Sequence, residues 1–240
     1  MRISIHQPNF LPWYPFFQKI KEVDRFVILT QCQFEKNNFQ NRVNLNNRWH
    51  TMSVKKGLEL IDKKLYINSD KDWNKIKINL NEYDDILSQF DNCISENLAK
   101  TNICIIRKMC EMLNIKTEIV IDYPTDLKST DRLVDLCKYY GATEYLSGGG
   151  GARQYLNIES FGNINVCFQK EIHKIHSLEF LRGDFDMIAT AEGDYESMLA
   201  MKVTALQSGM LNELIILDTK FDMVSTVKKA VEASGTYKKT

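Results

Sequence analysis

Apolar and polar positions in residues 1–30 follow a pattern that predicts a strand, a loop, a helix and a second strand. Ile3 and Ile5 alternate with polar neighbours, which is the period of a half-buried strand. Residues 6–13 contain two prolines, so they cannot form a regular helix or a central strand. Residues 14–23 carry apolar side chains at helical spacing, and residues 25–30 are mostly apolar and β-branched. This order is typical of a right-handed crossover between parallel strands.

The same periodicity predicts further elements along the rest of the chain. Strands are expected at 49–54, 117–122, 145–146 and 166–169, and helices at 73–98, 100–114, 129–140, 194–208 and 224–233. Neither an internal repeat nor a low-complexity linker is visible. We therefore expect an α/β protein in which residues 1–240 form a single domain, with a mainly parallel sheet flanked by helices and a frayed tail at about 234–240.

Composition limits the kinds of partner that the protein can have. Lys and Arg number 31, as do Asp and Glu, so the net charge is zero and there is no global attraction for nucleic acid or anionic membrane. No window approaches the length of apolar sequence that crosses a bilayer, and the first residues do not resemble a signal peptide. The six cysteines lie far apart without a CxxC pair, and we expect reduced core residues in a cytoplasmic protein.

A first polar group directly follows the first predicted strand. It consists of His6, Gln7, Asn9 and Trp13, and Pro8 restricts the loop that carries them. A pre-organised polar cluster beside an aromatic ring is what a small-molecule site needs, so we expect His6 to act in catalysis and the other three to bind substrate. The alternative is that His6 only caps the edge of the strand.

A second polar group lies in the loop after the second predicted strand, where ligand sites of α/β proteins collect. Its members are Gln33, Lys36, Asn41 and Arg42, with Phe34 and Phe39 as apolar anchors. Lys36 and Arg42 could clamp a phosphate or a carboxylate, Arg42 with two parallel hydrogen bonds, and we expect catalytic roles for both. Gln33 and Asn41 are expected to bind substrate. The alternative is a solvated loop with incidental charges.

The third group is a glycine-rich turn after the short strand at 145–146. Its expected substrate-binding residues are Ser147, Gly148, Gly149, Gly150, Gly151 and Arg153. Backbone amides of such a turn can approach an anion closely, because glycine has no Cβ. The spacing matches neither the Walker motif nor the dinucleotide fingerprint. A flexible hinge is the alternative, although the hydroxyl and the guanidinium that flank the glycines favour a ligand.

Metal and cysteine chemistry find little support in the sequence. His173 and His176 are three residues apart near Glu171 and Glu179, but no third ligand has helical spacing, so we expect surface residues and no metal site. Glu192, Asp194 and Glu196 are typical of an acidic helix start. The cysteines lack a neighbouring His or cation in sequence, so a cysteine nucleophile is unsupported.

The polar groups together resemble the WbqC-like family. The resemblance is carried by His6-Gln-Pro-Asn-Phe-Leu-Pro-Trp13, Gln33-Phe34 with Lys36, Gln40-Asn-Arg42, and Gly141-Ala-Thr-Glu-Tyr-Leu-Ser-Gly148 with Arg153 and Tyr155-Leu156. It covers about residues 1–55 and 129–170. The family occurs in gene clusters for O-antigen and other surface polysaccharides, which implies modification or transfer of a group on a nucleotide-activated sugar. Relatives linked with attaching amino acids to modified phage DNA bases imply acyl or aminoacyl transfer as a shared theme.

The order of strand, histidine loop, helix, strand and late Ser-Gly turn is also similar to the nucleotidyltransferase-like (HUP-type) topology. Our first hypothesis is a transferase acting on a nucleotide sugar or an aminoacyl or acyl donor. In it His6 contacts phosphate or acts as acid or base, Lys36 and Arg42 neutralise charge, and the glycine turn cradles the anion. The alternatives are a non-catalytic binding or scaffold subunit and amino acid transfer to DNA bases. The cofactor is unknown, with a nucleotide and Mg²⁺ compatible with the site, and pathway enzymes are the expected protein partners.

Overall fold

A computed structural model provides the structure, and it describes residues 1–149, 156–170 and 176–182. The chain divides into two compact units, Met1–Ser177 and Leu178–Thr240. The helices expected at 194–208 and 224–233 and the expected frayed tail lie outside the described residues. The first unit contains the sheet and, by residue range, all three polar groups of the sequence analysis.

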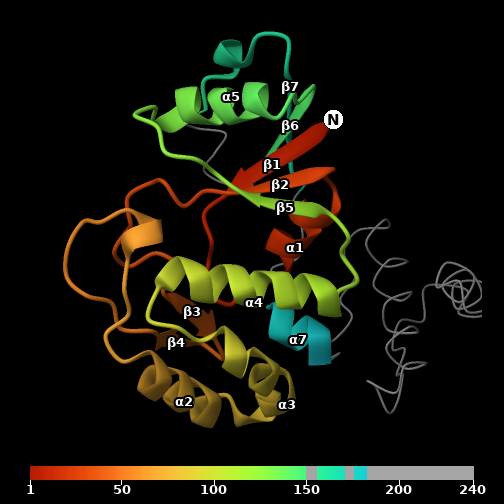
Figure 1. The fold of residues 1–240 in the computed structure, drawn as a ribbon. Coiled ribbons are helices and arrows are strands. Elements are labelled where there is room, and N and C mark those ends of the chain that lie inside the picture. Colours follow the sequence, from red (N-terminus) through yellow and green to blue (C-terminus); the bar gives the residue numbers. More distant parts are fainter. Residues whose placement is uncertain (150–155, 171–175, 183–240) are drawn as a thin grey trace, which may run out of the picture. The chain divides into compact units, whose positions relative to one another are not determined.

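The first unit is built on a five-stranded parallel sheet, which confirms the predicted α/β fold (Figure 1). The strands are β1 (Arg2–His6), β2 (Arg25–Ile28), β5 (Glu118–Ile121), β6 (Glu144–Ser147) and β7 (Asn165–Phe168). They lie in the order β5-β2-β1-β6-β7. In chain order this places the first strand in the centre, the second and third on one side of it, and the fourth and fifth on the other. That is the order of the central strands in doubly wound nucleotide-binding folds.

Helices and turns connect the strands, and one hairpin stands apart. The helices are α1 (Tyr14–Lys21), α2 (Ser69–Asn79), α3 (Asp84–Leu87), α4 (Leu98–Met112), α5 (Ser129–Tyr139) and α7 (Ser177–Arg182), with 3₁₀ turns at Ile61–Lys63, Asn81–Tyr83, Ser88–Cys93 and Ile158–Phe161. β3 (Arg42–Leu45) and β4 (Arg48–Thr51) form a separate antiparallel ribbon. Asn46 and Asn47 join them with positive φ angles of 54° and 56°, which the two-residue turns of hairpins require.

The single helix expected at 73–98 is wrong, because the chain leaves the helix at Leu80. Leu80 has φ −123° and ψ 39°, outside the helical region. The segment then continues as short helical pieces. Their apolar side chains are all buried, including Leu80, Tyr83, Ile86, Leu87 and Phe90. The spacing of these positions would also fit one face of a straight helix, so the apolar period alone does not reveal the break at Leu80.

Each face of the sheet is covered by its own helix, and α1 and α5 lie on opposite sides in Figure 1. On one face, Ile3, Ile5 and Val27 belong to a buried cluster that includes Val134 and Cys137 of α5. On the other face, the ring of Phe16 in α1 meets the edges of His6 and Phe26 at centroid distances of 5.1 and 5.3 Å. Side chains alternate between faces along a strand, so this division places His6 on the α1 face.

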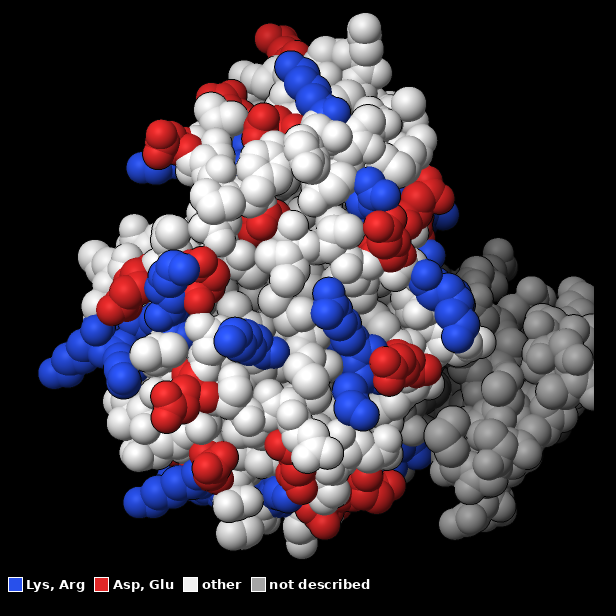
Figure 2. All heavy atoms as spheres, in the orientation of Figure 1, with Lys and Arg blue, Asp and Glu red and all other residues white. Residues whose placement is uncertain are grey.

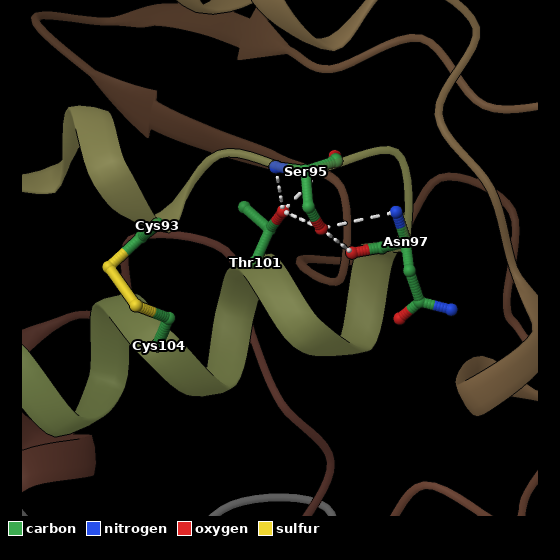
Figure 3. Close-up of a disulfide and its surroundings, with 5 residues drawn as sticks. All are labelled: Cys93, Ser95, Asn97, Thr101 and Cys104. Carbon is green, nitrogen blue, oxygen red and sulfur yellow. Dashed lines mark hydrogen bonds between the residues drawn. A yellow bond between two sulfur atoms is a disulfide. The ribbon is translucent and has the colours of Figure 1, made fainter.

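Two of the six cysteines form a disulfide, which corrects the expectation that all are reduced (Figure 3). Cys93 and Cys104 are joined between a 3₁₀ turn and α4, with their Cα atoms 5.3 Å apart. They come together because the chain reverses sharply before α4: the Asn97 side chain caps the helix by accepting from the Lys100 amide at 2.9 Å, and the Ser95 amide donates to the Thr101 hydroxyl. Among the described residues, Cys32, Cys110, Cys137 and Cys167 are free thiols. Within the same part of the chain, no helix is long and apolar enough to cross a membrane.

Candidate functional site

The carboxyl edge of the sheet, where the parallel strands end, brings together segments far apart in the sequence. The strand order reverses between β1 and β6, and ligands of open α/β sheets bind outside the carboxyl ends of the strands at such a reversal. β1 ends at His6, and β6 ends at Ser147. Their paired register stops at Ile3 and Tyr145. The first polar loop and the glycine turn therefore leave neighbouring strands at the same edge.

His6 holds a neutral imidazole at this edge. Its Nδ1 lies 2.8 Å from the Gln7 carbonyl oxygen, and a carbonyl only accepts, so Nδ1 carries the proton and Nε2 presents its lone pair. Burial, together with the charge of Lys19, lowers the pKa of His6 from 6.5 to about 3. The ring is therefore uncharged at neutral pH, and it can accept a hydrogen bond through Nε2.

A buried amide network fixes the loop after His6. The Gln7 side-chain oxygen, Oε1, accepts from the Gln40 side-chain amide at 2.7 Å, and Gln40 is completely buried. The Asn102 amide in α4 donates to the backbone carbonyls of Pro8 and Gln40 at 2.8 and 2.7 Å. This network joins the loop of the first polar group to the loop of the second polar group, and both loops to α4. Our sequence analysis missed Asn102, whose only signal is an amide in the middle of an apolar helix face.

Asn9 and Trp13, the other members of the first group, differ in their surroundings. Asn9 is partly buried and its side chain has no hydrogen bond within the described part of the chain. Trp13 pairs through its backbone with His176, and their rings lie 5.9 Å apart. The Trp13 indole nitrogen is buried, and none of the described residues accepts a hydrogen bond from it. Since a buried donor without a partner costs free energy, this nitrogen is one point at which a ligand could accept.

His176 is buried, which corrects the expectation that it lies on the surface. Its Nε2 donates to the Leu11 carbonyl at 3.1 Å, so it supports the backbone of the first polar loop. Burial lowers its pKa to about 3. No group of three metal-binding side chains exists among the residues that the structure describes. His173, Glu192, Asp194 and Glu196 lie outside those residues.

Two members of the second polar group are exposed to solvent, and the other two contact the β3–β4 ribbon and its neighbouring residues. Gln33 and Lys36 are exposed. The Asn41 side chain donates to the Met52 carbonyl at 2.8 Å and is buried. Arg42 stacks on Trp49, with its guanidinium carbon 4.0 Å from the ring centroid, and donates to the Asn37 carbonyl. Asn41 and Arg42 thus have partners inside the fold, and the roles expected for all four residues stay predictions.

The described half of the glycine turn lies at the end of β6, while Gly150, Gly151 and Arg153 lie outside the described residues. Ser147 is buried, and its carbonyl accepts from the Gln169 amide at 2.8 Å. A Cβ on Gly149 would come within 2.7 Å of the Gln169 carbonyl oxygen, whereas a Cβ on Gly148 would meet no atom within 4 Å. Gly149 is therefore needed for packing, whereas Gly148 borders open space after the end of β6.

This difference gives a matched pair of variants in one turn. We expect Gly149→Ala to lower the free energy of unfolding by about 1–3 kcal/mol, because the new methyl group presses on backbone. Gly148→Ala should change it by less than about 0.5 kcal/mol. Urea unfolding of both variants measures the difference. Equal effects of the two substitutions would show that the turn does not pack as described.

A second network at the carboxyl edge was missed in the sequence. The Asp122 carboxylate, just after β5, accepts from the Thr30 amide at 2.7 Å, the Thr30 hydroxyl at 2.9 Å and the Gln31 amide. Arg132 in α5 completes the network with an ion pair to Asp122 at 3.2 Å, and both side chains are almost fully buried. These contacts fix the loop after β2. In the sequence, Asp122 could have been singled out because it is an acidic residue directly after an apolar strand.

The surface of the described residues away from the edge carries mixed charges and a hollow. The face in Figure 2 carries Lys and Arg interspersed with Asp and Glu, as the zero net charge leads one to expect. A wide hollow runs along α2, lined by Asn68, Lys71, Asp72, Asn74, Lys75 and Ile78. Its lining comes from one helix and the residue before it, so it does not gather groups from distant segments. The carboxyl edge is the better candidate site.

Comparison with known proteins agrees with the sequence motifs. The model of the WbqC-like protein family matches residues 7–180, which include the first polar loop, the second polar group and the glycine turn. Uncharacterized protein Rv1507c of Mycobacterium tuberculosis is 27% identical over 184 residues, covering 69% of this chain and 79% of that protein. No solved structure matches the chain. The family match spans well over half of the sequence, and the protein therefore belongs to the WbqC-like protein family.

Proposed function

We propose that the protein is a group-transfer enzyme whose donor is an activated small molecule, either a nucleotide sugar or an aminoacyl or acyl donor. The pathway would be the modification of surface polysaccharide such as O-antigen, at which the family name hints. One observation carries the proposal: His6 ends β1, Gly148 directly follows the end of β6, and these neighbouring strands meet at the reversal of strand order. In open α/β sheets this is the position at which nucleotides and related ligands bind.

The chemistry of the edge suits a phosphate-bearing donor. Backbone amides of the glycine turn would approach the phosphate oxygens, since Gly148 leaves space there. The neutral His6 would accept a hydrogen bond from the donor or from the attacking group through Nε2. A pKa of about 3 makes His6 a weak base in the free protein. We therefore propose that His6 positions the donor, with Lys36 and Arg42 as further proposed contacts to its charge.

The test combines binding and turnover. The protein is screened by thermal shift against nucleotide sugars and aminoacyl adenylates, and each ligand that binds is incubated with polysaccharide acceptors. His6→Gln should lower kcat/KM by at least about tenfold, because a positioning contact is lost. His50→Gln, at a buried histidine of the β3–β4 ribbon, should keep the parental value. A His6→Gln protein as active as the parent would remove His6 from the site.

Two other outcomes point to the alternative functions. A thermal shift that grows with ligand concentration, without product after long incubation, would favour a binding or scaffold subunit. The weak basicity of His6 is the observation that keeps this alternative in view. Transfer of an amino acid to an oligonucleotide with a modified base would instead place the protein in DNA modification.

A further inference from the structure

Lys19, in the last turn of α1, is buried, and no described residue pairs with its ammonium group. Its side chain is among the buried charged groups, with 2% of the residue exposed, and neither a carboxylate nor a hydrogen-bond acceptor contacts it in the described part of the chain. Lys64, the other fully buried lysine there, differs sharply: its Nζ donates to the Gly57 carbonyl at 2.9 Å and to Glu59 at 2.7 Å. Buried charges in proteins are normally paired, so the isolation of Lys19 needs an explanation.

The surroundings of Lys19 lead to the carboxyl edge. Its Nζ lies 5.7 Å from the ring centroid of Phe26, whose edge contacts Phe16, which in turn contacts His6. α1 begins after the loop that follows His6, so its N-terminus faces the carboxyl edge. Helical side chains lean toward the N-terminus of their helix, and that direction carries the Lys19 ammonium toward His6. The charge of Lys19 also contributes to the lowered pKa of His6, so the two groups interact.

The free energy balance of this arrangement favours a ligand. Burial lowers the pKa of Lys19 from 10.5 to about 7, so the free protein holds the amine with its charge poorly stabilised. His6 faces Lys19 from β1 and cannot neutralise it, while the nearest contact from β2 is the ring of Phe26. A bound anion would supply the counter-charge that the described residues do not.

We propose that Lys19 is an anion-binding residue of the carboxyl-edge site, and that its ammonium pairs with a phosphate group of the donor. The inference rests on the proposed function for the place of the donor. To that function it adds a specific cation, Lys19, for the donor phosphate, and it explains why a lysine is buried at this position. Binding of the phosphate draws a proton onto Lys19, so that the charged ammonium and the anion form together. A methionine at this position keeps the apolar stem but removes the pairing.

Inorganic pyrophosphate is the probe, and its affinity is measured by calorimetry at pH 7 for the parent and three variants. Lys19→Met should weaken binding by at least about tenfold, as the loss of a desolvated ion pair does. Lys19→Arg should keep most of the affinity, because the charge remains. Lys64→Met, at the partnered lysine, should bind as the parent does. Circular dichroism of each variant establishes that it is folded.

A second measurement separates a direct role from a structural one. In protein labelled with ¹⁵N-lysine, the Lys19 side-chain resonance, assigned by its absence from Lys19→Met, should titrate near pH 7 in the free protein and at higher pH with pyrophosphate. Unchanged titration, equal affinity of Lys19→Met and the parent, or no pyrophosphate binding by the parent would overturn the role of Lys19. If nucleotide sugars still bind and turn over in that case, the proposed function stands. If no activated donor binds, the proposed function fails as well.

Discussion

Asp122→Ala is expected to lower the free energy of unfolding by about 3–5 kcal/mol, one of the largest effects of a single substitution in this protein. The substitution removes the acceptor for the Thr30 amide and hydroxyl and leaves the buried Arg132 without its ion pair to Asp122. Arg132 keeps its ion pair to Asp135 at 3.0 Å, so the cost comes from the unsatisfied Thr30 donors and from the share of the buried guanidinium charge that Asp122 had balanced. Equilibrium unfolding in urea, with the slope checked for two-state behaviour, measures the change.

A control variant lies in β5, the strand that directly precedes Asp122. Glu118 at the start of β5 pairs with Arg25, but its side chain is 55% exposed, so Glu118→Ala should cost less than about 1 kcal/mol. The double variant Asp122→Leu with Arg132→Met should recover much of the loss, because no buried charge remains. If Asp122→Ala and Glu118→Ala cost the same, the network does not hold the carboxyl edge together.

The periodicity of the sequence was enough to predict a parallel sheet, and with it that the loops after its strands lie at one carboxyl edge. Ile3, Ile5 and residues 25–30 carried clear strand patterns, and all strands of a parallel sheet end on one side. His6 and Gly148 could therefore be expected at the same edge before the strand order was known. The order itself depends on which strands find each other across the long segment 29–117, and local patterns do not contain that information.

Other features depended on contacts that no spacing reveals. Asn41 was predicted as a substrate contact, but its amide donates to the Met52 carbonyl at the edge of a hairpin whose first strand was not predicted. The disulfide depends on the reversal before α4, which brings Cys93 to Cys104. Lys19 did have a signal. It lies three residues after Phe16 and four before Val23, so a helix through this segment places the lysine on the apolar face.

Because Lys19 is buried on the apolar face of α1, its replacement is the second substitution with a large expected effect. It should stabilise the fold, and the gain in the free energy of unfolding should depend on pH. Lys19→Met should raise the free energy of unfolding by about 4 kcal/mol at pH 7, because the cost of burying the ammonium disappears. The folded protein has the lower pKa, about 7 against an ordinary 10.5 for the unfolded chain, so the unfolded chain binds more protons between these values. The parent therefore gains stability as pH rises through this window, and the advantage of the variant should fall to about 1 kcal/mol at pH 10.

Urea unfolding at pH 7, 8, 9 and 10 tests this dependence, and working above pH 6.5 keeps the titration of His6 out of the measurement. Lys64→Met is the control, and it should lower the free energy of unfolding instead of raising it. It removes a lysine that donates to Glu59 and to the Gly57 carbonyl. A stabilised Lys19→Met protein that no longer binds pyrophosphate would fit a common pattern, in which a binding residue is retained at a cost to stability. A Lys19→Met protein less stable than the parent at every pH would mean that the ammonium already has a partner within the fold, and that Lys19 serves structure and not the ligand.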